Sequence, residues 1–180
     1  MYQDVHHLIS DRYRGAHGAV ATTRYPRYCV VTDDRGPRAV VGYRHASDGP
    51  LFLESYLDQP VEAVVSDRFG RPVSRESIVE LGSHASSKSR ATIALWAEAA
   101  DTLGHDHQIG VAVLTAQLRS MFRRIGLPII EIAAANASCL SGEQGAWGHY
   151  YAADPIVCAG EIWAARAALS GWNDAAGRRA

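Results

Sequence analysis

Apolar positions in the first part of the chain predict one helix followed by a pair of strands. Val5, Leu8 and Ile9 recur at helical spacing, which predicts an amphipathic helix over residues 2–15. Two segments rich in β-branched and aromatic residues then flank a short Asp/Gly turn, over 28–32 and 39–44. This arrangement is typical of an antiparallel β-hairpin.

Beyond the hairpin, strands alternate with helices. A third strand over 51–57 and a short helix over 60–69 come first. The further strands expected cover 77–83, 109–114, 127–132 and 156–162, and the further helices cover 87–103 and 117–125. Strand–helix–strand order requires crossover connections and favours parallel pairs. We therefore predict an α/β (α+β) fold with a mixed central sheet, in which antiparallel N-terminal strands precede a β-α-β-α-β core.

Length and composition are those of an ordinary globular protein. At 180 residues, with 47% apolar and 21% charged residues, the chain fits one domain, expected over 1–165, with a C-terminal tail over 166–180. The net charge of −1 gives no overall attraction to nucleic acid or to anionic membranes. Three cysteines in no ligand spacing indicate reduced thiols, and no apolar run has the length of a signal or membrane segment. We expect a cytoplasmic protein without a membrane partner, a nucleic-acid partner or a metal site.

One acid stands inside an apolar strand. Glu80 follows Ile78 and Val79, where a carboxylate is costly to bury unless it is used or paired. The polar residues after it lead into a helix, where free backbone N–H groups and hydroxyls bind anions and carbonyl oxygens. The residues assigned to this donor-binding segment are Leu81, Ser83, Ala85, Ser86, Ser87, Lys88, Ser89 and Arg90. An acid followed by such donors and a helix is typical of a transferase site.

Four segments, in chain order, carry a resemblance to a known family. They are Gly49–Asp58, Ile78–Gly82, Leu118–Pro128, and Trp147–Tyr151 with Asp154 and Pro155. On these segments the chain resembles the thermostable hemolysin family, which has a GNAT-like acyltransferase fold related to acyl-homoserine-lactone synthases. The resemblance implies transfer of an acyl group from a pantetheine thioester to an acceptor. Family members usually continue the acid-bearing strand with Gly-Asn-Leu-Ala, whereas this chain has Gly82-Ser83-His84-Ala85.

Acyl transfer to an amine needs a base, donors for an oxyanion and often an acid for the leaving thiolate. Glu80 is the candidate base or acceptor anchor, since burial raises the pKa of a carboxylate, and its alternative is a structural ion pair. His84 is a second candidate base, or it simply fills an apolar family position. Tyr150 and Tyr151 are candidates for the acid, or are core tyrosines.

The acceptor side is assigned to Glu54, Tyr56 and Trp147. Glu54 and Tyr56 share one face of the expected third strand, which lines the acceptor pocket or forms a polar outer face. Trp147 walls the acyl pocket or covers the core.

Residues 86–90, where acyltransferases of this fold that use acetyl-CoA have a glycine-rich loop, contain no glycine that would let the backbone approach a pyrophosphate closely. Either hydroxyls with Lys88 and Arg90 hold the phosphates of CoA, or the donor carries one phosphate, as phosphopantetheine on an acyl carrier protein does. The resemblance to lactone synthases favours the carrier protein. The basic residues that would contact an acidic carrier, or that form a solvated helix face, are Arg119, Arg123 and Arg124.

The predicted function is direct N-acyl transfer from an acyl carrier protein or acyl-CoA to a small amine-bearing metabolite, in specialised biosynthesis. No tightly bound cofactor is expected, because the acyl-phosphopantetheine is a co-substrate. Three alternatives stay open: a lactone-synthase-like enzyme that uses S-adenosylmethionine, a membrane-active lytic protein, and a non-catalytic binding module on the same scaffold.

Overall fold

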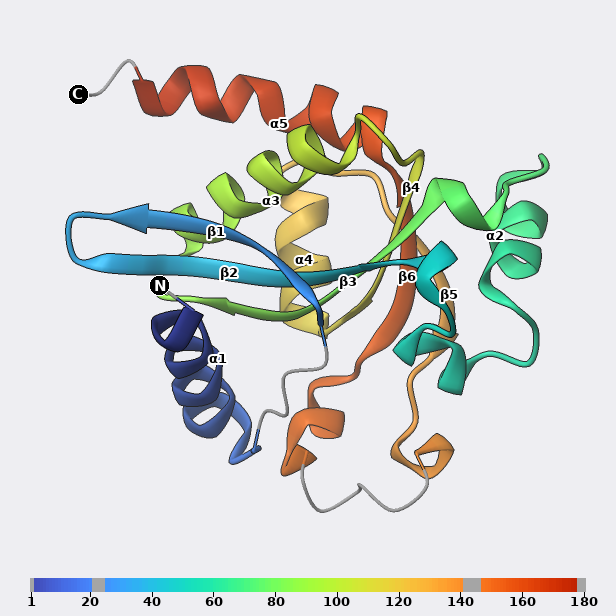
Figure 1. Ribbon diagram of the computed structural model, residues 1–180, viewed down its shortest axis with the longest axis horizontal. Helices are drawn as coiled ribbons and strands as arrows, with labels where there is room; N and C mark the ends of the chain where they lie inside the picture. The colour runs from blue at the N-terminus through green and yellow to red at the C-terminus, as the bar shows by residue number, and fades with distance from the viewer. Residues whose placement is uncertain (1, 21–24, 141–146, 178–180) are drawn as a thin grey trace.

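The central sheet starts with a hairpin, which forms where the sequence pattern predicts it. β1 (Arg27–Asp33) and β2 (Gly36–His45) are antiparallel, and Gly36 supplies the positive φ of 105° at the turn. The computed structural model describes residues 2–20, 25–140 and 147–177, and there this hairpin belongs to a six-stranded sheet (Figure 1). The remaining strands are β3 (Ile78–Ser86), β4 (Ile109–Leu114), β5 (Ile130–Ala134) and β6 (Ile156–Glu161).

The sheet is mixed, as predicted. Its strand order is β1-β2-β3-β4-β6-β5, with β6 inserted between β4 and β5. β3 and β4 are parallel, and the other neighbouring strands are antiparallel. The parallel pair is connected through a helix, which is the crossover that the strand–helix–strand pattern predicts.

Helices cover both faces of the sheet. On one face α1 (Tyr2–His17) packs Val5 and Ile9 against β2 and β3, and α2 (Val61–Phe69) covers the same face further along. The other face holds α3 (Ser89–Leu103), α4 (Ala116–Arg124) and α5 (Ile162–Gly177). Figure 1 shows α1 on the opposite side of the sheet from α3 and α5. None of the helices in the described ranges is long and apolar enough to cross a membrane.

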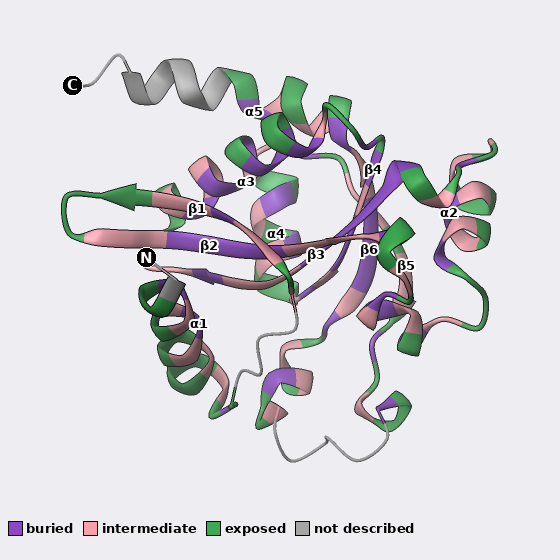
Figure 2. Ribbon diagram, viewed as in Figure 1, coloured by how far each residue is buried: buried purple, intermediate pink, exposed green. Residues whose placement is uncertain are grey.

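The core lies along the middle of the sheet. β2 is buried through its central residues and β3 through its first four, and the helices are buried on the sides that face them (Figure 2). Val40, Val41 and Val79 have no exposed surface. Strands that are covered on both faces need apolar side chains on both, which explains why the sequence of these strands is nearly continuously apolar.

The expected third strand over 51–57 is wrong. Residues Phe52–Tyr56 instead form the short 3-10 helix η2. The Glu54 carboxylate accepts hydrogen bonds from the backbone N–H groups of Leu51 (2.8 Å) and Val61 (2.9 Å), and these bonds bend the chain around it. Arg75 also pairs with Glu54, at 2.8 and 2.9 Å, from a segment distant in sequence. The alternating pattern over 51–57 gives no indication that Arg75 pairs with Glu54.

The expected boundary between a domain ending at 165 and a tail also differs from the structure. Helix α5 (Ile162–Gly177) runs across that position. Leu169 is 1% exposed within the main core, and Arg166 pairs with Asp101 of α3 at 2.9 Å. The single domain therefore includes the first half of this helix.

Candidate active site

A cleft opens where β3 and β4 part. The two strands are paired only as far as Leu81 and Ala112, although β3 continues to Ser86 and β4 to Leu114. The cavity there has a volume of about 430 Å³. It extends from α1 on one face of the sheet to the first turns of α3 and α4 on the other face.

A bulge in β3 decides which side chains face each end of this cleft. Ser83 and His84 together oppose the single residue Val41 of β2, and Ser83 has a positive φ of 48°. Before the bulge, Glu80 lies on the α1 face. After it, Ala85 returns to the α1 face and His84 lies beside Trp96 of α3.

Tyr25 occupies a slot made by two glycines on neighbouring strands. Gly42 and Gly82 are directly paired, so that neither strand presents a side chain at this point. A Cβ on Gly42 would lie 2.6 Å from the Tyr25 Cβ, and a Cβ on Gly82 would overlap the Tyr25 hydroxyl. Tyr25 lines the cleft and donates a hydrogen bond to Glu80.

Glu80 is buried as predicted, with an exposed fraction of 1%. Its Oε1 accepts from the backbone N–H of Leu53 at 2.8 Å, and its Oε2 accepts from that of Phe52 at 3.1 Å. Burial raises the pKa of Glu80, and the two backbone donors, Arg44 and Tyr25 partly oppose that rise. Glu80 does not line the cleft, and Tyr25 stands between them. Among the described contacts, Tyr25 is the link between this acid and the cleft.

Aromatic residues form the wall of the cleft on the α1 side. Tyr150 stacks on Tyr13 with ring centroids 6.4 Å apart, and Trp147 lies 5.4 Å from Tyr150. The turn that carries them is fixed to the end of α1, because His149 donates its backbone N–H to the His17 carbonyl at 2.7 Å. Burial raises the pKa of Tyr150 well above its usual range, so its hydroxyl keeps its proton at neutral pH.

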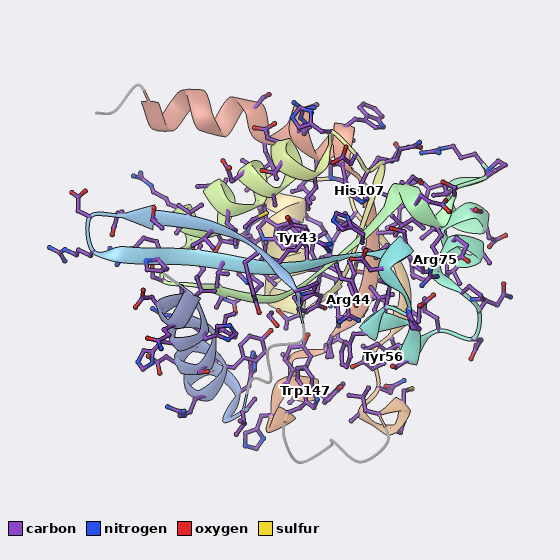
Figure 3. All side chains as sticks on the ribbon, viewed as in Figure 1. Tyr43, Arg44, Tyr56, Arg75, His107 and Trp147 are labelled. Atoms are coloured by element: carbon purple, nitrogen blue, oxygen red, sulfur yellow. The ribbon has the colours of Figure 1, made fainter. Side chains whose placement is uncertain are left out.

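The residues predicted for the acceptor side are separated by the structure. Tyr56 and Trp147 line the cleft, and Figure 3 labels both. Glu54 does not line it, because its carboxylate is held by Arg75, which lies apart from Trp147 in Figure 3. That ion pair lowers the pKa of Glu54 to about 2. Tyr151 also lies outside the lining, with its hydroxyl 2.7 Å from that of Tyr56.

His84 lines the cleft on the α3 side. Burial lowers the pKa of its imidazole to about 4, so the ring is neutral at physiological pH and is a weak base. Its Nε2 atom is buried and has no hydrogen-bond partner within residues 2–20, 25–140 and 147–177. The same holds for Ser87 Oγ, Trp96 Nε1 and Trp147 Nε1, which line the same cavity.

The predicted donor segment lies along the cleft, with one exception. The residues that line it are Leu81, Ser83, Ala85, Ser86, Ser87, Lys88 and Ser89. Arg90 is exposed and outside the lining. Helix α3 begins beside these residues, and Thr115 caps α4 nearby, so two helix N-termini face this end of the cavity.

The three arginines of α4 have different surroundings. Arg119 is 4% exposed and donates to Glu131 (2.9 Å) and Asp154 (2.6 Å), so its assignment to a carrier-protein surface is wrong. It also donates to the carbonyls of Leu114 and Asp154, which ties α4 to β4 and to the start of β6. Arg123 is exposed beside Glu131, and Arg124 lines the cleft.

A second, smaller cavity adjoins the cleft on the helix-rich face. It has a volume of about 70 Å³ and an apolar lining from α3, α4, β4, β6 and α5. Four residues line both spaces, namely Leu81, Trp96, Ala112 and Leu114. The apolar cavity therefore adjoins the cleft at these residues.

Sequence reasoning missed three residues of this site. Tyr25 precedes a proline in a segment without periodicity, and its slot depends on glycines from two strands. Trp96 and Tyr13 lie in the helices expected over 87–103 and 2–15, but the sequence assigned neither residue to the site. Their proximity to β3 follows from the packing of helices on the sheet, which no local pattern encodes.

Comparisons with known proteins agree with this architecture. The sequence profile of the family described as Thermostable hemolysin matches residues 1–166. No curated protein matches the sequence. Among solved structures, TofI in a ternary complex with an inhibitor and MTA superimposes with a TM-score of 0.62 at 18% identity, covering 94% of this chain and 91% of that chain.

Two further solved structures have a similar backbone. BjaI, a CoA-dependent acyl-homoserine lactone synthase with SAM and isopentyl-CoA, gives a TM-score of 0.63 at 14% identity over 98% of this chain and 83% of that chain. FeeM, an N-acyl amino acid synthase from uncultured soil microbes, gives 0.59 at 13% identity over 92% of this chain and 94% of that chain. At these identities the likeness establishes the shared fold.

Proposed function

Because this chain belongs to the thermostable hemolysin family, we propose that it is an N-acyltransferase that moves an acyl group from a phosphopantetheine thioester to the amine of a small metabolite. The observation that carries the proposal is the cleft between β3 and β4, with the buried acid Glu80 hydrogen-bonded to the cleft residue Tyr25. Donor and acceptor meet in this cleft from opposite faces of the sheet.

The donor enters at the α3 and α4 end. Lys88 and Arg124 are cationic and line that end, and the two helix N-termini add positive potential there. Ser86, Ser87 and Ser89 supply hydroxyls. These groups suit the phosphate of phosphopantetheine, carried either by CoA or by an acyl carrier protein. The absence of glycine from residues 86–90 supports the donor with fewer phosphates, which is the carrier protein.

The acyl chain occupies the apolar cavity beside the cleft. Its lining residues are apolar, and it shares Trp96 and Ala112 with the cleft. A volume of about 70 Å³ holds a few methylene groups without rearrangement. The donor is accordingly a short to medium acyl thioester, and longer chains need the Trp96 side chain to move.

The acceptor binds between α1 and the aromatic wall. The amine proton passes to the Tyr25 oxygen while the Tyr25 proton passes to Glu80, whose raised pKa brings it nearer the range of a useful base. The amine nitrogen forms the new C–N bond to the thioester carbon, and the C–S bond breaks. Tyr150, which holds its proton, is the candidate to protonate the leaving thiolate. The cycle closes when Glu80 releases the proton it gained to solvent and Tyr150 takes one up from solvent.

A lactone-synthase-like reaction with S-adenosylmethionine is the second candidate, because BjaI, of the same fold, was solved with SAM. The lining of this cleft favours a different acceptor. Its formally charged residues within the described ranges, Arg12, Lys88 and Arg124, are all cationic, and they repel a sulfonium. An amine that also carries a carboxylate suits the charge of Arg12 better.

The test is a two-way screen with the purified protein. Acyl thioesters from acetyl to dodecanoyl, on CoA and on a carrier protein, are combined with a panel of amino acids, polyamines and S-adenosylmethionine. Release of free thiol and the mass of the acylated product are measured. An N-acyl product supports the proposal, a homoserine lactone selects the second candidate, and no thiol release from any pair contradicts both.

A further inference from the structure

We propose that the side chains of His84 and Trp96 bind the thioester carbonyl of the donor and stabilise the oxyanion that forms during transfer. This inference rests on the proposed acyl transfer. It assigns His84 the role of a hydrogen-bond donor in place of the general base that the sequence suggested. It also gives a function to the dipeptide at which this chain departs from the usual family sequence, Ser83-His84.

Two buried nitrogens at the cleft have no hydrogen-bond partner among the residues that the structure describes. His84 Nε2 and Trp96 Nε1 are both buried and unpaired, and both residues line the cleft. Leaving such a group unpaired costs about 1–3 kcal/mol, so a ligand that pairs with both nitrogens gains binding energy. The two rings have centroids 6.0 Å apart. The two nitrogens therefore belong to neighbouring side chains in the same part of the cleft.

The surrounding structure holds both rings in place. The bulge at Ser83 turns His84 onto the α3 face, whereas unbroken alternation from Glu80 would put it on the α1 face. Phe122 packs edge-on against the Trp96 ring, with centroids 5.0 Å apart. Donors fixed in advance of the reaction stabilise a developing charge without reorganisation.

The protonation state of His84 suits a donor. Burial lowers its pKa to about 4, and the formally charged residues around the same cavity are the cations Lys88, Arg124 and Arg12, which oppose a further positive charge. A neutral imidazole still has one N–H to donate. As the amine nitrogen attacks, the carbonyl π electrons move onto oxygen, and they return when the C–S bond breaks. His84 and Trp96 keep their protons throughout.

The carbonyl could instead belong to a pantetheine amide, which has the same hydrogen-bonding chemistry. The two cases differ in kinetics, because contacts to the thioester oxygen strengthen in the transition state and contacts to an amide do not. We expect His84→Phe and Trp96→Phe each to lower kcat about 100-fold, with the donor KM within about threefold of wild type. His84→Gln retains an N–H and is expected to lose no more than about tenfold. The exposed His105→Gln is the matched control and stays at wild-type activity.

The deciding measurement is the infrared carbonyl stretch of a 13C-labelled acyl thioester bound in the absence of acceptor. Wild type is expected to shift the band to lower frequency, and His84→Phe to return it toward the value in water, with both proteins folded by circular dichroism. An unshifted band in wild type overturns the inference, because the two nitrogens are then satisfied by water. If His84→Gln is as inactive as His84→Phe, His84 acts as a base. If His84→Phe and Trp96→Phe change only the donor KM, the two nitrogens contact the pantetheine amide. Wild type that releases no thiol from any thioester contradicts the proposed function itself.

Discussion

Glu80→Gln separates a catalytic role of this acid from a structural one. The carboxylate accepts one backbone N–H on each oxygen, from Leu53 and from Phe52. Glutamine offers a single carbonyl oxygen, so one of these buried N–H groups loses its acceptor and faces an NH₂ group. That loss costs about 1–3 kcal/mol of unfolding free energy.

One effect limits the net loss of stability. The pKa of Glu80 is raised in the folded state, so its stabilising contribution is present below the unfolded pKa and is lost as pH rises through the folded pKa. At neutral pH the neutral glutamine avoids that penalty. A domain with a typical stability of about 5–15 kcal/mol therefore stays folded. Loss of a general base, by contrast, lowers turnover by about 10²–10⁴-fold.

The assay compares kcat/KM for thiol release with unfolding in urea, for Glu80→Gln and for a matched control. Glu161→Gln is that control: Glu161 ends β6 and pairs with Ile109, at the end of β4 opposite to the cleft. Its partly exposed ion pair with Arg71 contributes at most about 1 kcal/mol, and its activity is expected to be unchanged. If Glu80→Gln keeps kcat/KM within about threefold of wild type, Glu80 only anchors the backbone of η2, and the proton route through Tyr25 is wrong.

Three further predictions concern stability and donor binding. Gly82→Ala places a methyl group on the Tyr25 hydroxyl and is expected to cost about 1–3 kcal/mol in urea unfolding, more than Gly110→Ala, whose Cβ would meet Leu81 at 3.3 Å. Arg119→Ala leaves the Leu114 and Asp154 carbonyls unpaired and should lower stability by about 2–4 kcal/mol, whereas Arg124→Ala should weaken donor binding in calorimetry without that loss. Glu54 has a folded pKa of about 2 against an ordinary 4.5, which corresponds to a stabilising contribution of about 3 kcal/mol. This contribution is present above the unfolded pKa and is lost as pH falls toward 2. Glu54→Gln should flatten this part of the curve of stability against pH, and an unchanged curve would contradict the Arg75 pair.

Most of the elements follow from local sequence. The helical spacing of Val5 and Ile9 and the β-branched hairpin each predicted an element that forms, because apolar period and turn residues act over a few positions. The exception is η2, where Glu54 is organised by Arg75 from 21 residues away. A distant ion pair of this kind overrides an alternating pattern.

The site was predictable where one strand carries it. Glu80 and the polar segment after it lie together because they are consecutive on β3 and at the start of α3. Burial of Glu80 also followed from its apolar neighbours. Tyr25 was not predictable, because its position depends on two glycines that only strand pairing brings together. Arg119 and Arg124 are arginines of the same helix and look alike in sequence. Only the folded structure shows that Arg119 is buried in hydrogen bonds between elements and that Arg124 lines the cleft.

The bulge at Ser83 has an evolutionary consequence. The bulge absorbs one extra residue without changing the pairing beyond it, since Ala85 still pairs with Val40. Deletion of the Ser83 codon would therefore give an unbroken strand in which His84 stays on the α3 face and Ala85 on the α1 face. A lineage can thus gain or lose the residue with positive φ in one genetic step and keep the side chains that the two faces of the strand present to the cleft.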